Sequence, residues 1–194
     1  MKNIVLAASF ALATQALAAD PPKVAAPAAA APAATAADQA PPPPAPELGA
    51  AMKGMEGKWK CEGKAPDSAF GKAHPIKAEM TSRSDLNGYW YLSRYEEKKT
   101  KENPTPYVME STVGFDPSKK TLVRTDVDGM GLVTHLTSKG WEGDKMAWSG
   151  EVMGMKMLFK DTLTKKSDKE VTTTLEMAGP DGKFSLMAEL TCKK

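Results

Sequence analysis

The sequence predicts an all-β fold: a closed antiparallel up-and-down barrel of about ten strands, preceded by a short helix. From residue 57 onward, segments of alternating apolar and polar residues recur at the spacing that sandwiches and barrels have. Pairs such as Asn87-Gly88 and Asp116-Pro117, which favour tight turns, separate these segments. Cys61 and Cys192 lie in the first and last segments, so a bond between them would join the two ends of such a sheet.

Residues 1–18 are typical of a secretory signal peptide. Lys2 precedes an apolar run from Ile4 to Leu12, and Ala16-Leu17-Ala18 offers the small residues that signal peptidase requires. The run is shorter than the roughly 20 apolar residues of a membrane span, although a retained anchor is the alternative. No later segment is apolar enough to cross a bilayer. We therefore expect export through a Sec-type signal to the periplasm or the medium.

Residues 19–46 consist mostly of alanine and proline and are expected to form a disordered linker before a domain at residues 47–194. Proline favours the extended polyproline II conformation, which makes such a tract a semi-rigid spacer. The tract is either a passive tether or a ligand for a proline-recognition domain, since its composition alone does not separate the two.

The domain is expected to begin with a short helix from Glu47 to Met55, because Leu48, Met52 and Met55 fall on one side. Strands are expected near residues 57–64, 74–84, 88–97, 106–115, 120–127, 131–138, 144–150, 152–165, 168–178 and 183–192. The strand at 88–97 is apolar on both faces and cannot be oriented. Alternation orients the last three strands, whose apolar faces point to a buried interior while the opposite faces are polar.

A disulfide between Cys61 and Cys192 is expected, because two cysteines in an exported protein seldom both stay free. Two separate thiols are the alternative.

Gly57-Lys58-Trp59 resembles the Gly-x-Trp motif of lipocalins and their calycin relatives. In that family the tryptophan plugs one end of the barrel, often under a basic residue of the last strand, which here would be Lys193 or Lys194. Gly114-Phe115-Asp116-Pro117, residues 121–131, 140–144 and 180–183 resemble a bacterial family of uncharacterised lipocalin-like barrels. The resemblance spans residues 48–192 and implies a ten-stranded barrel without an agreed activity.

Haem-binding relatives of this barrel use a histidine on a late strand. This sequence has only His74 and His135, on early and middle segments. The resemblance therefore implies no haem, and we expect no cofactor.

Met153-x-Met155-x-Met157 is the pattern with the most chemical content. On a strand, period-two spacing would point all three thioethers the same way, and thioethers suit Cu(I), with His135 as a further ligand. The alternative is that methionine fills an irregular apolar interior. We favour the alternative and expect no metal site.

The sequence does not predict an enzyme or a nucleic-acid-binding protein. No nucleophile motif, phosphate loop or zinc spacing is present, and Asp126 and Asp128 precede a glycine turn without calcium-loop spacing. Positive and negative residues nearly cancel, at 26 and 24, and the basic residues are mostly dispersed lysines.

The expected function is to bind a small apolar molecule inside the barrel. The residues expected to line the pocket are Trp59, Met153, Met155, Met157, Phe159, Leu175, Met177, Phe184 and Leu186. The alternative is a structural or interaction module of the cell envelope, with a side-chain-filled barrel and a protein partner that contacts Trp90.

Overall fold

The computed structural model describes residues 41–68, 71–179 and 181–194. The predicted signal peptide and residues 19–40 of the predicted linker lie outside these ranges. The chain divides into two units between Pro41 and Pro42, and the second, Pro42–Lys194, is described below. Among the described residues, no helix has the length and apolar character that crossing a membrane would require.

A single α-helix, α1 (Pro46–Met52), precedes the sheet in the described part of the chain. Pro46 occupies its first turn, where a missing N–H costs no intrahelical bond. Leu48, Ala51 and Met52 are buried against the barrel. The expected short helix is confirmed, although it ends three residues before Met55.

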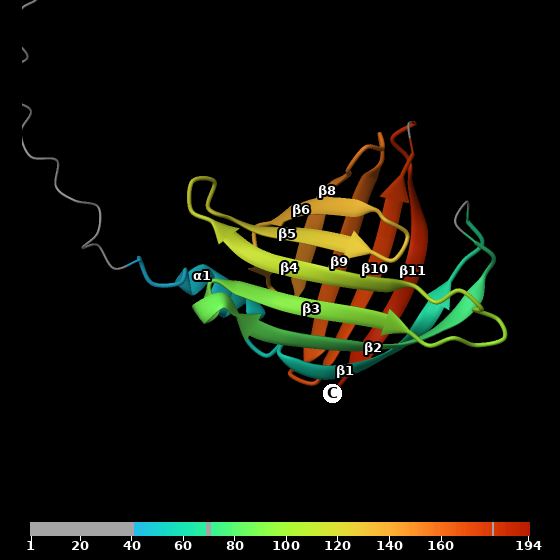
Figure 1. Cartoon of the computed structure of the whole chain (residues 1–194), viewed down its shortest axis with the longest axis horizontal. Helices are drawn as coiled ribbons and strands as arrows, with labels where there is room; N and C mark the ends of the chain where they lie inside the picture. Colours follow the sequence, from blue (N-terminus) through green and yellow to red (C-terminus); the bar gives the residue numbers. More distant parts are fainter. Residues whose placement is uncertain (1–40, 69–70, 180) are drawn as a thin grey trace, which may run out of the picture. The chain divides into compact units, whose positions relative to one another are not determined.

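Eleven strands form the sheet of the described residues, and every paired strand is antiparallel to its partner. They are β1 (Gly57–Ala65), β2 (His74–Asp85), β3 (Trp90–Glu97), β4 (Val108–Asp116), β5 (Thr121–Asp128), β6 (Val133–Ser138), β7 (Trp141–Glu142), β8 (Lys145–Val152), β9 (Leu158–Ser167), β10 (Glu170–Ala178) and β11 (Phe184–Lys193). β1 pairs with β11. β6 pairs directly with β8, although the two-residue β7 lies between them in the sequence. The strands other than β7 therefore form a closed ring of ten, and the predicted barrel is confirmed (Figure 1).

Two pairings close the ring, β1–β11 and β6–β8, and we call them its seams. Each seam contains a glycine at which two backbones approach closely. At the β1–β11 seam, a Cβ added to Gly63 would lie 1.9 Å from the carbonyl oxygen of Glu189. At the β6–β8 seam, a Cβ added to Gly150 would lie 1.9 Å from the carbonyl oxygen of His135. Any side chain at either position would push the strands apart, so glycine is required for both pairings as they stand.

Cys61 and Cys192 are directly opposite each other in the β1–β11 register. A disulfide joins them, with their Cα atoms 4.0 Å apart, and both side chains are buried inside the barrel. The predicted disulfide is confirmed, and it links the first and last strands of the ring.

The expected strand at residues 152–165 is wrong in its first part. β8 continues through Gly150 to Val152, and residues 153–157 form a turn before β9 begins. Within that turn, the Val152 N–H donates to the Met157 carbonyl, and Gly154 adopts a φ of +74°. Two glycines, Gly150 and Gly154, could end the strand, and the chain turns at Gly154, which has the positive φ.

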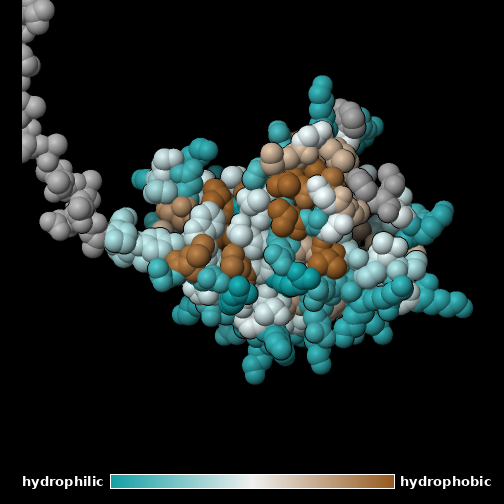
Figure 2. Space-filling view, viewed as in Figure 1, coloured by the Kyte–Doolittle hydropathy of each residue, from teal (hydrophilic) through white to brown (hydrophobic). Residues whose placement is uncertain are grey.

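The strand that alternation could not orient is β3. Tyr91 points inward and is buried, whereas Trp90 lies on the outer face. The Trp90 ring packs on Gly114 of β4, where an added Cβ would lie 2.6 Å from the ring. Other apolar side chains are also exposed, among them Met130 and Met153, and Figure 2 shows apolar groups between hydrophilic ones on the viewed face.

The disulfide should stabilise the barrel through the unfolded chain, because its partners are 131 residues apart. We expect reduction, or the double substitution Cys61→Ser/Cys192→Ser, to lower the free energy of unfolding by about 2–5 kcal/mol. Urea unfolding with and without dithiothreitol measures this. The double variant is the control, since reductant should leave its curve unchanged. Identical curves for the oxidised and reduced natural chain would contradict the expectation.

Candidate ligand-binding cavity

The barrel contains a cavity of about 590 Å³. Every strand of the ten-stranded ring contributes residues to its wall, and Met52 and Met55 contribute from α1 and the turn after it. Most of the lining side chains are apolar, including Ile76, Met80 and Leu163. A volume of this size lies within the range of pockets that hold small molecules.

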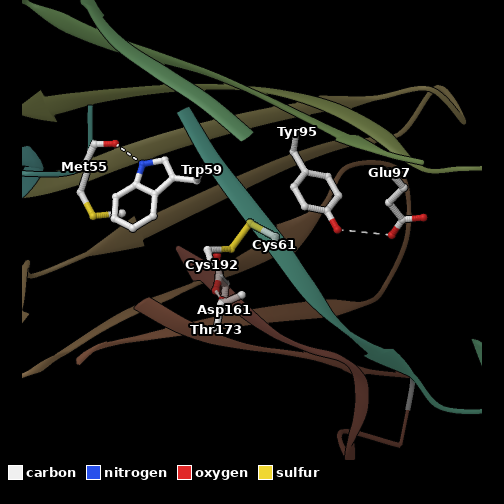
Figure 3. Close-up of a disulfide and its surroundings, with 8 residues drawn as sticks. All are labelled: Met55, Trp59, Cys61, Tyr95, Glu97, Asp161, Thr173 and Cys192. Atoms are coloured by element: carbon white, nitrogen blue, oxygen red, sulfur yellow. Dashed lines mark hydrogen bonds between the residues drawn. A yellow bond between two sulfur atoms is a disulfide. The ribbon is translucent and has the colours of Figure 1, made fainter. Parts of the chain in front are cut away.

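Trp59 closes the cavity near α1. Its indole N–H donates to the Met55 carbonyl at 2.9 Å (Figure 3), and the Trp141 indole donates to the Ala51 carbonyl at 2.7 Å. The ammonium of Lys194 lies 4.7 Å from the centre of the Trp59 ring and donates to the Gly54 carbonyl. Of the two basic residues at the end of the chain, Lys194 is therefore the one that lies over the Trp59 ring.

Four of the nine residues expected to line the pocket do line it: Trp59, Phe159, Leu175 and Met177. The other five are not among the described lining residues: Met153, Met155, Met157, Phe184 and Leu186. The three methionines lie in the turn between β8 and β9, where no strand alternation aims them inward. Met153 and Met155 are 54% and 40% exposed.

A β-bulge explains why Phe184 and Leu186 do not line the cavity. The β10–β11 register shifts so that Leu175 is opposite Ala188 while Glu176 is opposite Leu186, which leaves Met187 as the extra residue. Beyond the bulge the faces exchange, because a slip of one residue inverts a strand's alternation. Met187 lines the cavity, and Phe184 is exposed beside the ammonium of Lys160.

The residues considered for copper are not brought together. The methionines lie in a turn, and His135 faces outward, where its Nδ1 is 2.9 Å from the Thr125 hydroxyl. Across the described ranges, no group of three or more His, Cys, Asp or Glu side chains is placed to hold a metal ion.

The cavity also contains an ion-pair network that sequence reasoning missed. Arg124 of β5 donates through Nε and Nη2 to Asp126 Oδ2, at 3.0 and 2.8 Å, and through Nη1 to Asp161 Oδ2 of β9, at 2.7 Å. The exposed fractions of these three side chains are only 10%, 6% and 9%. Thr173 of β10 donates to the other Asp161 oxygen at 2.5 Å. Asp161 and Thr173 appear together in Figure 3.

Electrostatics keep Arg124 charged despite its burial. Burial alone would lower its pKa, but the carboxylates of Asp126 and Asp161 together outweigh that effect and raise the pKa above the ordinary value. Its guanidinium also lies 5.4 Å from the centre of the Trp148 ring.

Alternation contained the signal for this network. Leu122, Arg124 and Asp126 share one face of their strand, and Asp161 shares the inward face with Phe159 and Leu163. Charged residues on an apolar face are rare in a barrel filled only by side chains, so they mark an interior with a polar site.

At the opposite end from α1, Glu97 holds the segment between β3 and β4. Its carboxylate accepts from the Tyr95 hydroxyl at 3.4 Å (Figure 3), the Asn103 amide at 2.7 Å and the Tyr107 backbone N–H at 3.0 Å. The Tyr107 hydroxyl donates to Asp128 at 3.2 Å. Burial, reinforced by the adjacent carboxylates, raises the pKa of both Tyr95 and Tyr107.

Residues 48–194 match the protein family described as "Protein of unknown function (DUF1579)". The chain belongs to this family. The resemblance to an uncharacterised barrel family is thereby confirmed at the level of family and fold. No curated protein matches the sequence.

Among solved structures, the crystal structure of Rv2717c from M. tuberculosis is similar to the DUF1579 chain, with a TM-score of 0.63. The match covers 78% of this chain and 98% of the other, at 10% sequence identity. At that identity the likeness shows a common fold and nothing about function.

Replacing Arg124 should destabilise the DUF1579 domain strongly, because two buried carboxylates would lose their cation. We expect Arg124→Met to lower the free energy of unfolding by about 3–5 kcal/mol in urea. Arg94→Met is the matched control, since Arg94 also pairs with two carboxylates, Glu96 and Glu110, but on the exposed face. Its effect should stay below about 1 kcal/mol. Equal effects of the two substitutions would contradict the assignment of Arg124 to a buried ion-pair network.

The raised tyrosine pKa values should make the domain sensitive to alkali. The folded state holds the phenolic protons of Tyr95 and Tyr107 more tightly than the unfolded state does. Their contribution to stability is therefore complete below the ordinary tyrosine pKa of about 10 and is lost as the pH rises above it. The free energy of unfolding should fall above that pH, and less steeply in Tyr95→Phe/Tyr107→Phe. Parallel pH profiles for the two proteins would count against this account.

Proposed function

We propose that the DUF1579 domain binds a small, largely apolar molecule in the cavity of its barrel. The observation that carries the proposal is the cavity itself, which has a volume of about 590 Å³ and is lined by residues of all ten strands, most of them apolar. A barrel filled by its own side chains, as a purely structural module would have, is hard to reconcile with this volume. The arrangement of Lys194 over Trp59 supports a lipocalin-like mode of ligand carriage.

The proposal includes no reaction. The Thr173 hydroxyl donates to a carboxylate of the cavity, Asp161, but that carboxylate is already paired with Arg124.

We also propose that the protein acts outside the reducing cytosol. The Cys61–Cys192 disulfide supports this location, because such bonds persist in oxidising compartments. The signal-like pattern of residues 1–18 points the same way, towards the periplasm or the medium.

Filling the cavity should weaken binding. Purified, delipidated protein should bind the uncharged naphthalene dye Prodan with enhanced fluorescence. The double substitution Leu175→Trp/Met177→Trp adds bulk on one inward face of β10 and should weaken binding by about tenfold or more, equivalent to about 1.4 kcal/mol.

Met153→Trp/Met155→Trp is the matched control. It adds the same bulk at two positions with the same spacing, but in an exposed turn outside the described cavity lining. Dye binding in this variant should match the natural chain. Failure of the natural chain to bind the dye, or equal losses in the two variants, would refute the proposal.

A further inference from the structure

One part of the cavity wall is polar. Ser82, Ser93, Ser111 and Asp126 are successive cross-strand partners on β2, β3, β4 and β5, so their side chains form a row along the inner surface. The Ser93 hydroxyl donates to that of Ser82 at 2.9 Å. The row ends at Asp126, where it meets the ion pair with Arg124.

Arg124 uses only one of the two carboxylate oxygens of Asp126. Oδ2 accepts from Arg124 Nε and Nη2, whereas Oδ1 is buried and has no hydrogen-bond partner among the described residues. A buried carboxylate oxygen without a donor is costly, by more than a neutral acceptor would be. Asp126 lines the cavity, but Oδ1 is covered in the structure, so the carboxylate must turn for a molecule in the cavity to reach this oxygen.

The charges of the cavity favour a cation at that position. Arg124, Asp126 and Asp161 together carry one positive and two negative charges. The other charged lining residues, with His74 left aside, are Lys72, Glu97 and Asp128. Among the described lining residues, four carboxylates therefore face two cations.

We propose that the ligand is an amphiphile with a protonated amine, whose N–H donates to Asp126 Oδ1 while its apolar portion contacts the apolar wall. This inference rests on the proposed binding function and specifies the ligand class. The amine supplies the donor that Asp126 Oδ1 lacks and balances the excess negative charge. A fatty carboxylate would instead bring two acceptors and a negative charge to an acceptor that is already unsatisfied.

Four matched ligands test the proposal by calorimetric titration of the full chain with its disulfide formed. They are decylamine, decan-1-ol, decanoate and decyltrimethylammonium, which share an alkyl chain and differ in the head group. Decylamine should bind about tenfold or more tighter than decan-1-ol, because an ammonium N–H donates to a carboxylate more strongly than the neutral hydroxyl does. Decanoate should bind most weakly. Decyltrimethylammonium should lose most of the gain, because it keeps the charge but has no N–H.

Asp126→Asn tests the residue, and Glu110→Gln is its control. Glu110 lies on the exposed face of the neighbouring strand β4, so the control removes the same charge outside the barrel. Asp126→Asn should reduce the preference for decylamine over decan-1-ol to within about threefold, and Glu110→Gln should leave it unchanged. The ranking of the four ligands on the natural chain tests the proposal even if Asp126→Asn does not fold.

The outcomes separate the two proposals. If decan-1-ol binds but decylamine binds no tighter, or if Asp126→Asn retains the preference, the amine assignment is overturned and the apolar binding function stands. If none of the four ligands binds, the binding function fails and the assignment fails with it.

Discussion

Closure of the sheet is the constraint on which the rest of the structure depends. An antiparallel sheet that stays open leaves unpaired backbone groups on two edge strands, and closure pairs both. Here closure depends on the β1–β11 and β6–β8 seams, and a glycine allows close backbone approach at each. Because the ring has ten strands, its inner faces also enclose more space than the inward side chains fill, and the cavity follows from the same geometry.

The two seams are held by different interactions. A covalent bond, Cys61–Cys192, crosses the first. No disulfide crosses the second, but Arg124 of β5 reaches Asp161 of β9, so the ion pair joins the strands on either side of the β6–β8 pairing. The same residues therefore link two halves of the ring and form the polar part of the cavity.

The architecture follows from the sequence because it depends on period-two alternation, turn-forming pairs and the position of two cysteines. Those signals predict strands, connections and the disulfide. The lining of the pocket was predicted only in part, because two local features change which face a residue occupies. Gly154 rather than Gly150 breaks the chain after β8, which turns the methionine run into an exposed turn. The bulge at Met187 exchanges the faces of β11 and moves Phe184 out of the interior. Neither feature has a distinctive residue pattern, since bulges and positive-φ glycines are selected by the register of neighbouring strands.

The buried charges of the cavity argue for binding rather than for stability. Removing a pair of charges from water costs several kcal/mol per ion, and apolar residues of similar volume often stabilise a protein as well or better. A barrel selected only for stability would gain little from Arg124, Asp126 and Asp161. What the ion pair supplies, and apolar packing does not, is an oriented carboxylate with one oxygen directed to neither Arg124 nor any other described donor. In a mainly apolar cavity such a group contributes most to deciding which ligand binds, because a mismatched head group leaves it unpaired in a medium of low polarity. The apolar wall would then provide affinity for any molecule of suitable size, and the polar row ending at Asp126 would provide the selectivity among them.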